Sequence, residues 1–456
     1  MQSRWLSWNL LFLLLPLQAA TSADDERGDA ERGYRTIRTV PYLPADFDDQ
    51  VFENLWKAWP ESWRTQAEKA TPEERRKMAF SRYGLIEPAD DAGVPGMALG
   101  YVRKGTAGWV MNCLACHGGK VAGKVIPGVP NSHFLLETLT EEVRLTKLTM
   151  KKPLTHMDLA QLNMPLGSTA GTTNSVMFGV ALGALRDDEM NVDRKKSVPK
   201  MVHHDMDPPP FWNVALKKQL YIDGFAPKNH RVIMQFMMLP TNSGATMRGW
   251  ENDYRDILAW IESLTPPKYP YTIDPPLAEK GRLLFEKNCS RCHGTYGTTT
   301  EYPEATIPIE DVGTDPVRFE SLTREYRNQM TTNWMSYHGR DRVVVEPKGY
   351  VAPPLRGIWA TAPYFHNGSV PTLWHVLNPS LRPKVWRRVS EDGYDEKNVG
   401  HVIEEFDELP DALRTPSEFR LYFDARKPGK SAKGHTYPGA LSDPERRAVL
   451  EYLKTL

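Results

Sequence analysis

The four cysteines of this 456-residue chain fall into two pairs, and a histidine directly follows each pair. The two motifs are Cys113-Leu114-Ala115-Cys116-His117 and Cys289-Ser290-Arg291-Cys292-His293. This spacing lets two thiols bond to the vinyl groups along one porphyrin edge, while the adjacent histidine turns back to coordinate the iron. A redox-active cysteine pair, a zinc site or a disulfide would leave the histidine after both pairs unexplained. The sequence therefore predicts two covalently bound c-type haems, attached at Cys113, Cys116, Cys289 and Cys292, with His117 and His293 as proximal iron ligands.

The length and charge of the chain restrict the kind of protein that carries these motifs. A chain this long has room for two or three domains, so a lone small electron carrier is too simple a description. Lys plus Arg and Asp plus Glu each total 57, which removes any compositional argument for nucleic-acid binding. Hydrophobic residues make up 40% and aromatic residues 10%, as in soluble globular proteins.

Residues 1–23 have the organisation of a secretory signal peptide. Arg4 precedes an apolar run around Leu10–Leu15, and Thr21-Ser22-Ala23 offers a small-residue cleavage site. An uncleaved anchor is the alternative, but the run is shorter than the ~20 residues that a membrane span needs. No later segment is long and apolar enough to span a bilayer. We therefore expect a periplasmic or otherwise exported protein, which agrees with haem attachment outside the cytoplasm.

An internal repeat surrounds the two motifs. Gly105 and Trp109 stand eight and four residues before Cys113, and Gly281 and Phe285 stand in the same places before Cys289. This spacing predicts a helix that packs over each haem edge. Downstream, residues 256–264 and 448–456 are similar amphipathic segments, the second opened by a capping box of Ser442 and Glu445. The alternative is that any two amphipathic helices look somewhat alike.

These features predict a mainly α fold with two cytochrome c-like haem domains, long ordered loops and an N-terminal arm. Between the repeats, residues 265–276 contain five prolines, which exclude a helix and favour an extended linker. The predicted divisions are a signal peptide at 1–23, an arm or subdomain at 24–95, a first cytochrome domain at 96–265, a Pro-rich linker at 266–276 and a second cytochrome domain at 277–456.

The sixth ligand of each iron decides between electron transfer and catalysis, because only an open position can bind dioxygen or peroxide. For the second haem we favour His435, since glycines on either side let its loop approach the haem face. His366, in an aromatic turn-rich cluster, fits a ligand and a buried histidine bonded to a propionate or backbone group equally well. The remaining candidates in that half are Met330, Met335, His338, His375 and His401.

The distal side of the first haem has a different set of candidates. Phe236 would keep that side apolar, and Gln235 could donate a hydrogen bond to a bound oxygen species. The competing interpretation is that this Met and aromatic stripe belongs to the hydrophobic core. The other candidate ligands in this half are His133, His156, His203, His204, His230, Met234, Met237 and Met238.

Several segments resemble a known family. Residues 352–373 resemble the region after the second haem in the bacterial di-haem cytochrome c peroxidase and MauG superfamily. Residues 382–384, 392–400, 434–437 and 225–238 are similar to the branch that contains the di-haem rubber oxygenase, the RoxA-like branch. The resemblance implies that the haem at His117 is reactive and that the haem at His293 is saturated and relays electrons. It also places Phe236 at an apolar distal position and His435 as the distal ligand of the second haem.

The chain departs from the peroxidase pattern in two places. In peroxidases the distal Gln-Phe pair continues into Trp-Asp-Gly-Arg and an acidic residue that assists peroxide cleavage, whereas here Met237 and Met238 follow. About fourteen residues after His366, where peroxidases have Met and MauG has Tyr, this chain has Ser380. Because Ser380 cannot replace those ligands, the second haem needs another ligand, which favours His435.

A calcium ion is common between the domains of this superfamily, but the sequence has no compact Asp and Asn cluster that requires one.

Three functions follow from these expectations. The leading hypothesis is an exported di-haem oxidoreductase that activates dioxygen or peroxide at the N-terminal haem, with the C-terminal haem relaying electrons. The alternatives are a non-enzymatic di-haem electron carrier and a cytochrome c peroxidase. The expected partners are a small redox protein or a small-molecule oxidant or substrate, with no nucleic acid and no membrane span after signal cleavage. The sequence makes no prediction of the oligomeric state.

Overall fold

The computed structural model describes residues 28–390 and 392–456, so the predicted signal peptide lies outside the described residues. About 41% of the described residues are helical and 12% are in strands, so helix predominates as predicted. The α-helices of the described residues are α1 (Ala30–Thr39), α2 (Asp49–Asn54), α3 (Glu61–Lys69), α4 (Pro72–Tyr83), α5 (Leu114–His117), α6 (Leu136–Thr149), α7 (His156–Asn163), α8 (Ser175–Ala184), α9 (Gly244–Gly249), α10 (Glu251–Ser263), α11 (Pro275–Asn288), α12 (Ser290–His293), α13 (Ile309–Val312), α14 (Val317–Ser321), α15 (Arg324–Thr332), α16 (Leu373–Leu377), α17 (Pro416–Phe419) and α18 (Asp443–Leu453).

Short strands and 3-10 helices connect these helices. The strands are β1 (Phe47–Asp48), β2 (Tyr101–Lys104), β3 (Gly108–Met111), β4 (Gly118–Val121), β5 (Lys124–Pro127), β6 (Gln219–Leu220), β7 (Ala226–Pro227), β8 (Thr306–Pro308), β9 (Gly349–Val351), β10 (Val385–Arg388), β11 (Tyr394–Asp395), β12 (Gly400–His401), β13 (Ile403–Phe406) and β14 (Tyr422–Asp424). The 3-10 helices are η2 (Leu55–Ala58), η3 (Phe211–Leu216), η4 (Val232–Met237), η5 (Trp334–Ser336), η6 (Ile358–Ala360), η7 (Pro379–Leu381) and η8 (Tyr437–Ala440). Two small antiparallel sheets have three strands each, in the orders β1-β3-β2 and β13-β10-β14.

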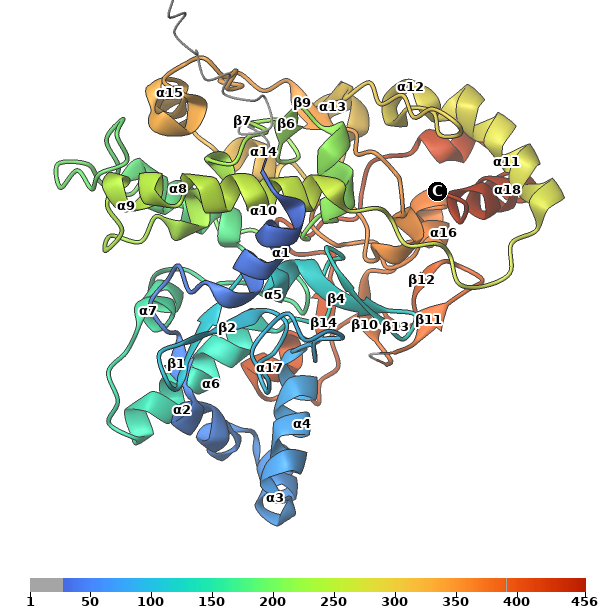
Figure 1. Ribbon diagram of the computed structural model, residues 1–456. Helices are drawn as coiled ribbons and strands as arrows, with labels where there is room; N and C mark the ends of the chain where they lie inside the picture. The colour runs from blue at the N-terminus through green and yellow to red at the C-terminus, as the bar shows by residue number, and fades with distance from the viewer. Residues whose placement is uncertain (1–27, 391) are drawn as a thin grey trace, which may run out of the picture.

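Two pairs of helices cross in the same way in the two halves of the chain. The helices α11 and α18 lie side by side, and α1 lies across α10 (Figure 1). Each crossing is made possible by a glycine. A Cβ on Gly281 would lie 1.8 Å from the Ala448 carbonyl oxygen, and one on Gly33 would lie 2.0 Å from that of Asp256. Since Asp256 and Ala448 open the two similar downstream segments, the crossings occupy matching positions of the repeat.

The first half of the repeat differs from the sequence prediction. The helix expected over Gly105 to Trp109 is wrong, because β2 and β3 form a β-hairpin there, with Gly105 in its turn at φ 62°. Trp109 packs into the hydrophobic core from β3, and its indole N–H donates to Asp49 Oδ1 at 2.6 Å. The helix that matches α11 is α1, since residues 30–33 read Ala-Glu-Arg-Gly and residues 278–281 read Ala-Glu-Lys-Gly. A helix inside the predicted arm therefore packs on the closing helix of the first half; the domain divisions themselves stay predictions.

The boundaries of the second half follow local rules. The expectation that residues 265–276 exclude a helix is wrong at its end, because Pro275 and Pro276 form the first turn of α11. Proline is tolerated there since its missing N–H has no helical partner at that position, and the Asp274 side chain caps the helix. The capping box of Ser442 and Glu445 at α18 is confirmed.

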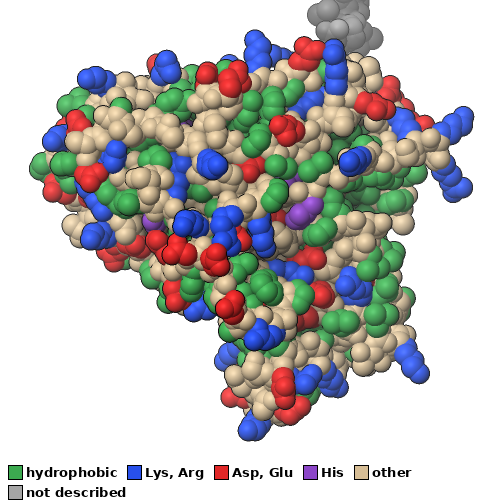
Figure 2. All heavy atoms as spheres, turned by 180° about the vertical axis from the view of Figure 1, so that it is seen from behind, with side chains coloured by type: hydrophobic (Ala, Val, Ile, Leu, Met, Phe, Trp, Pro, Cys, Tyr) green, Lys and Arg blue, Asp and Glu red, His purple; other side chains and the backbone are tan. Residues whose placement is uncertain are grey.

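Three hydrophobic clusters make up the core, and the haem motifs border them. Cys113 borders the cluster around α8, α10 and η4, and Cys116 borders the cluster formed with α2 to α4. Cys289 borders the cluster of α11, α16 and α18. No helix of the described residues has the length and apolar character needed to cross a membrane. On the face shown in Figure 2, cationic and anionic side chains are interspersed.

Candidate haem sites

The histidine of the first motif is hydrogen-bonded to a proline carbonyl. His117 ends the short helix α5, and its Nδ1–H donates to the Pro209 carbonyl oxygen at 2.9 Å. Phe211 stacks on the imidazole at 4.1 Å between ring centroids. Burial lowers the pKa of His117 to about 4, so the ring is neutral at physiological pH. With the hydrogen held on Nδ1, the lone pair of Nε2 is available to a metal.

The second motif repeats this arrangement. His293 ends α12, and its Nδ1–H donates to the Pro353 carbonyl oxygen at 2.8 Å. Burial lowers the pKa of this imidazole as well. Both prolines belong to Pro-rich loops far along the chain from the motif, Pro208–Pro210 and Pro353–Pro354. The same orienting contact in both halves fits two proximal iron ligands.

The thiols fit haem anchors better than a redox-active pair. All four cysteines are free and half-buried. Burial raises the pKa of Cys113 to about 11, of Cys116 to about 12 and of Cys289 to about 11, whereas reactive thiol pairs have lowered values. Within the described residues, no group of three or more His, Cys, Asp or Glu side chains is arranged to hold a metal ion.

His435 lies opposite His293. The two ring centroids are 6.1 Å apart, and the ring planes are inclined by 70°. Two imidazoles on opposite sides of one metal, each with a nitrogen about 2.0 Å from it and a centroid about 1.1 Å behind that nitrogen, have centroids about 6 Å apart. The observed separation therefore fits a metal held between the two rings. That His435 is a ligand stays a prediction.

The backbone around His435 is bent to bring the ring there. Gly434 has φ 78°, and a Cβ on it would lie 2.2 Å from the Gly313 backbone. His435 has φ 45°, an uncommon value for a residue with a side chain, and its N–H donates to the Val312 carbonyl at 2.6 Å. Arg382 fixes the same loop by donating to the carbonyls of Ala432 and Gly434 at 2.6 and 2.7 Å.

The other candidates for the second haem lie against other groups. His366 stacks against Tyr350, with ring centroids 4.7 Å apart, and its Nε2 is buried without a hydrogen-bond partner. His375 bonds to Thr372 at 2.8 Å. His338 contacts the Thr332 carbonyl, His401 packs against His133, and Met330 and Met335 lie in the core cluster of the first half.

Most histidines of the first half also have partners of their own. His156 contacts Asp46, His203 contacts Asp205, His204 bonds to the Val202 carbonyl, and His230 contacts Glu251 and Tyr337. Met234, Met237 and Met238 are buried in the core, as the competing interpretation of this stripe predicts. Buried ring nitrogens of His133, His156 and His204 nevertheless lack a hydrogen-bond partner among the described residues, and the His133 ring faces His401.

Gln235 and Phe236 lie on η4, which packs against α8. Gln235 is buried, its Oε1 lies near Gly179, and its Nε2 has no hydrogen-bond partner among the described residues. Phe236 is half-buried and packs against the hydrophobic cluster that Cys113 also borders. A buried amide without an acceptor costs free energy, so Gln235 is poised to donate to a group that enters this cluster. The distal role of both residues stays a prediction.

Three contributors escaped the sequence analysis. These are the carbonyls of Pro209 and Pro353 and the guanidinium of Arg382. The Pro-rich loops were visible in the sequence, but which residue they orient depends on tertiary structure. Arg382 was noted for its resemblance to the rubber oxygenase branch, not for its contacts with the His435 loop.

Comparison with known proteins supports the haem assignment. The family described as RoxA-like, cytochrome c-like matches residues 349–387, which include the Pro353 carbonyl and Arg382. The cytochrome c peroxidase Ccp of Escherichia coli is 28% identical over 129 residues, covering 26% of this chain and 23% of that protein. The chain is thus similar to RoxA-like, cytochrome c-like proteins and to a cytochrome c peroxidase. These similarities support a cytochrome c-like domain, c-type haem and a haem-based redox role.

Two uncharacterized proteins of Sinorhizobium fredii are also similar to this chain. The protein y4iM is 29% identical over 43% of the chain, and y4iJ is 29% identical over 42% of it. The matched regions span 52% and 41% of those proteins, about half of their lengths. The solved hydrazine synthase of Kuenenia stuttgartiensis is 14% identical, with a TM-score of 0.22 over 67% of this chain and 94% of its own.

Proposed function

We propose that this protein is an exported di-haem c-type cytochrome and an oxidoreductase. It activates dioxygen or peroxide at the haem of Cys113, Cys116 and His117, while the haem of Cys289, Cys292 and His293 relays electrons. The observation that carries this proposal is an asymmetry between the sites. His435 lies opposite His293 at 6.1 Å, whereas the ring that lies against His117 is the phenyl ring of Phe211.

The residues of each site support different roles. When bound, an iron with an open sixth position supplies binding and activation of a small oxidant, whereas a saturated iron only transfers electrons. At the second site, His293 and His435 would both ligate the iron. At the first site, Phe236 would exclude water and Gln235 would offer an N–H to a bound oxidant, while the Pro209 carbonyl holds the hydrogen of His117 on Nδ1.

Peroxide reduction is the second candidate, because the Escherichia coli relative is a cytochrome c peroxidase. The segment η4 ends in Met237, and Met238 follows it, so no acidic side chain stands after Phe236 to assist peroxide cleavage. This chemistry favours dioxygen over peroxide as the oxidant. A non-enzymatic electron carrier would instead need two saturated irons.

A cyanide titration of the ferric protein distinguishes these functions. Haem content is first fixed by the pyridine haemochrome assay. We expect one cyanide to bind for every two haems, with the low-spin spectrum of the second haem unchanged. Two haems that do not bind cyanide contradict the proposal and indicate a carrier. Turnover with peroxide and reduced cytochrome c would assign the protein to the peroxidases; we expect it to be negligible.

A further inference from the structure

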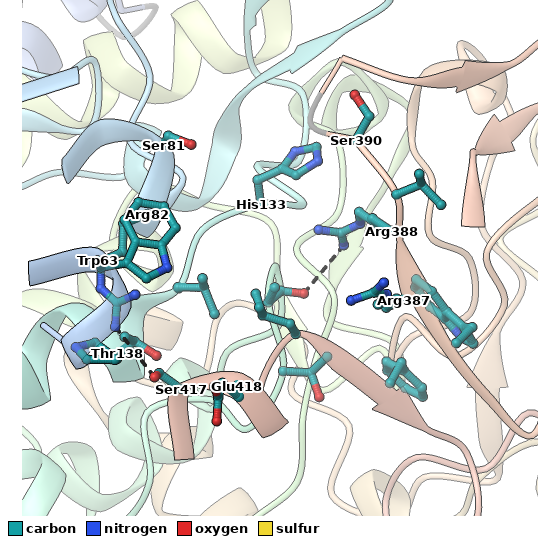
Figure 3. A pocket seen from close by; sticks show the side chains of 18 of the residues that line it. Trp63, Ser81, Arg82, His133, Thr138, Arg387, Arg388, Ser390, Ser417 and Glu418 are labelled. Atoms are coloured by element: carbon teal, nitrogen blue, oxygen red, sulfur yellow. Dashed lines mark hydrogen bonds between the residues drawn. The ribbon is translucent and has the colours of Figure 1, made fainter. Parts of the chain in front are cut away.

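A pocket opens between the first half of the chain and the sheet of β10, β13 and β14. Its volume is about 300 Å³, and its walls include Trp63, Trp386, Arg82, Arg388 and His133. Figure 3 shows the side chains of His133 and Arg388 extending toward one another from opposite walls. The pocket therefore combines aromatic walls with a basic inner end.

The three arginines of this pocket have different partners. Arg82 makes a bidentate pair with Glu142, and Arg387 pairs with one oxygen of Glu404, from Nη2 at 2.7 Å and from Nε at 2.8 Å. Arg388 has no carboxylate partner among the described residues. Its hydrogen bond runs from Nη2 to the Ala170 carbonyl at a long 3.4 Å, and its Nε is buried without a partner. A buried guanidinium N–H without an acceptor is costly inside a protein.

His133 presents a second nitrogen without a partner. Its Nε2 is buried and makes no hydrogen bond with the described residues. The His401 ring packs edge-on against it at 5.9 Å between centroids, and His401 Nε2 also lacks a partner. Either nitrogen of a neutral imidazole can carry the hydrogen, so His133 can donate from Nε2 to an acceptor placed beside Arg388.

The electrostatic surroundings of this cluster favour an anion. Burial and the charge of Arg388 lower the pKa of His133 to about 3 and that of His401 well below its usual value, and burial lowers that of Arg388 to about 10. Asp207 is the nearest acid that affects Arg388, but no ion pair joins them, and burial raises the pKa of Asp207 well above its usual value. The cluster thus holds donors and positive charge without a matching negative charge.

We propose that Arg388 and His133 bind a carboxylate at the inner end of this pocket. Two carboxylate oxygens match the fork of a guanidinium, and one of them can also accept from an imidazole N–H. A metal ion fits less well, because Arg388 would repel a cation and no group of three suitable ligands exists among the described residues. Burying the carboxylate there would raise the pKa values of all three basic groups back toward normal.

Two sources can supply this carboxylate. One is a propionate of a covalently bound haem, and this source rests on the proposed function. The backbone supports this source, because one short segment connects the surroundings of Arg388 with His117. Asp207, the acid that affects Arg388, donates its N–H to the His366 carbonyl, and Pro209, two residues further on, accepts from His117. The other source is a diffusible carboxylate that enters between Trp63 and Trp386.

The test uses the full-length protein and the variants Arg388→Gln and His133→Gln, with Arg387→Gln as the matched control. Arg387 precedes Arg388 on β10, carries the same charge and is already paired with Glu404. Haem content and thermal unfolding are measured for each variant. One arm measures the reduction potential of each haem by spectroelectrochemistry. The other measures binding of acetate and benzoate by calorimetry.

A haem propionate at this site predicts that Arg388→Gln lowers the potential of one haem more than Arg387→Gln does, and that acetate does not bind. A diffusible ligand predicts saturable acetate or benzoate binding that weakens about tenfold or more in Arg388→Gln, since a charge-assisted hydrogen bond contributes about 1.5 to 3 kcal/mol. The proposal is overturned if the reduction potentials are unchanged and no carboxylate binds. It is also overturned if a carboxylate binds with the same affinity to the native protein, Arg388→Gln and His133→Gln. If the protein contains no haem, the proposed function fails, and the calorimetric arm alone decides on this site.

Discussion

Replacing His435 by alanine tests the ligand assignment on which the functional asymmetry rests. In the native protein, the His293 and His435 rings stand 6.1 Å apart, the separation expected for two ligands of one iron. The aromatic rings nearest to His435 belong to Phe365 and Tyr437, at 6.0 and 5.6 Å. A phenyl ring cannot ligate iron, and burial raises the pKa of the Tyr437 phenol, so that residue stays protonated.

The size of the effect follows from the number of sites. With two haem motifs and one substitution, about half of the total haem changes from low spin to high spin, and the haem at His117 keeps its spectrum. Thr436 and Tyr437 are exposed beside the vacated position, so added imidazole has access and restores the low-spin form.

The measurement is the ferric absorption and electron paramagnetic resonance spectra, with spin counts normalised to total iron. His375→Ala is the control, because His375 is a buried histidine of the same half that bonds to Thr372. An His435→Ala spectrum identical to that of the native protein refutes the assignment. So does an equal change in His375→Ala.

Three further predictions concern the distal residues, the helix crossing and a buried ion pair. Gln235→Leu weakens cyanide binding at the first haem and leaves the low-spin signal of the second unchanged; unaltered cyanide affinity speaks against a distal role for this amide. Gly281→Ala forces a Cβ to within 1.8 Å of the Ala448 carbonyl oxygen and lowers the free energy of unfolding by about 1 to 2 kcal/mol, because overpacking outweighs the gain in helix propensity. In urea denaturation, Gly249→Ala, with nothing within 4 Å, serves as the control. Asp223→Asn leaves Arg318 and Arg327 buried without their carboxylate and costs about 3 to 5 kcal/mol. Those arginines lower the pKa of Asp223 below its ordinary 3.8, so its contribution to stability is complete above that pH and is lost as the pH falls further; a urea midpoint that is equally pH-dependent in Asp223→Asn contradicts this.

Local patterns of the sequence predicted the parts of the site that depend on neighbouring residues. The cysteine and histidine spacing fixes which side chains share each short helix, and the capping box at Ser442 and Glu445 depends on residues three apart. The glycine before His435 indicated a loop that approaches another segment closely, and a Cβ there would indeed meet Gly313.

Contacts between distant segments explain what the sequence analysis missed. The helix that matches α11 is α1, but α2, α3, α4 and the β2–β3 hairpin stand between it and the first haem motif. We therefore expected the matching helix immediately before Cys113, where the structure has the β2–β3 hairpin. The Ala-Glu-Arg-Gly run at residues 30–33 was the available signal, since it nearly repeats residues 278–281.

The orienting carbonyls could not be predicted for the same reason. His117 and Pro209 are joined by a hydrogen bond across 92 residues, and His293 and Pro353 by one across 60 residues. No local rule links a proline carbonyl to a histidine that far away. Proline-rich loops indicate rigid backbone, but tertiary structure alone decides which side chain they hold.

The central claim is that one chain carries two c-type haems, one saturated by His293 and His435 and one open at His117. Electron paramagnetic resonance of the resting ferric protein, with total iron and haem counted on the same sample, tests it most directly. The account predicts two haems per chain and equal amounts of a low-spin signal and a high-spin or water-ligated signal, of which the second alone changes with cyanide. A single haem per chain, or two low-spin signals that do not change when cyanide is added, would contradict it.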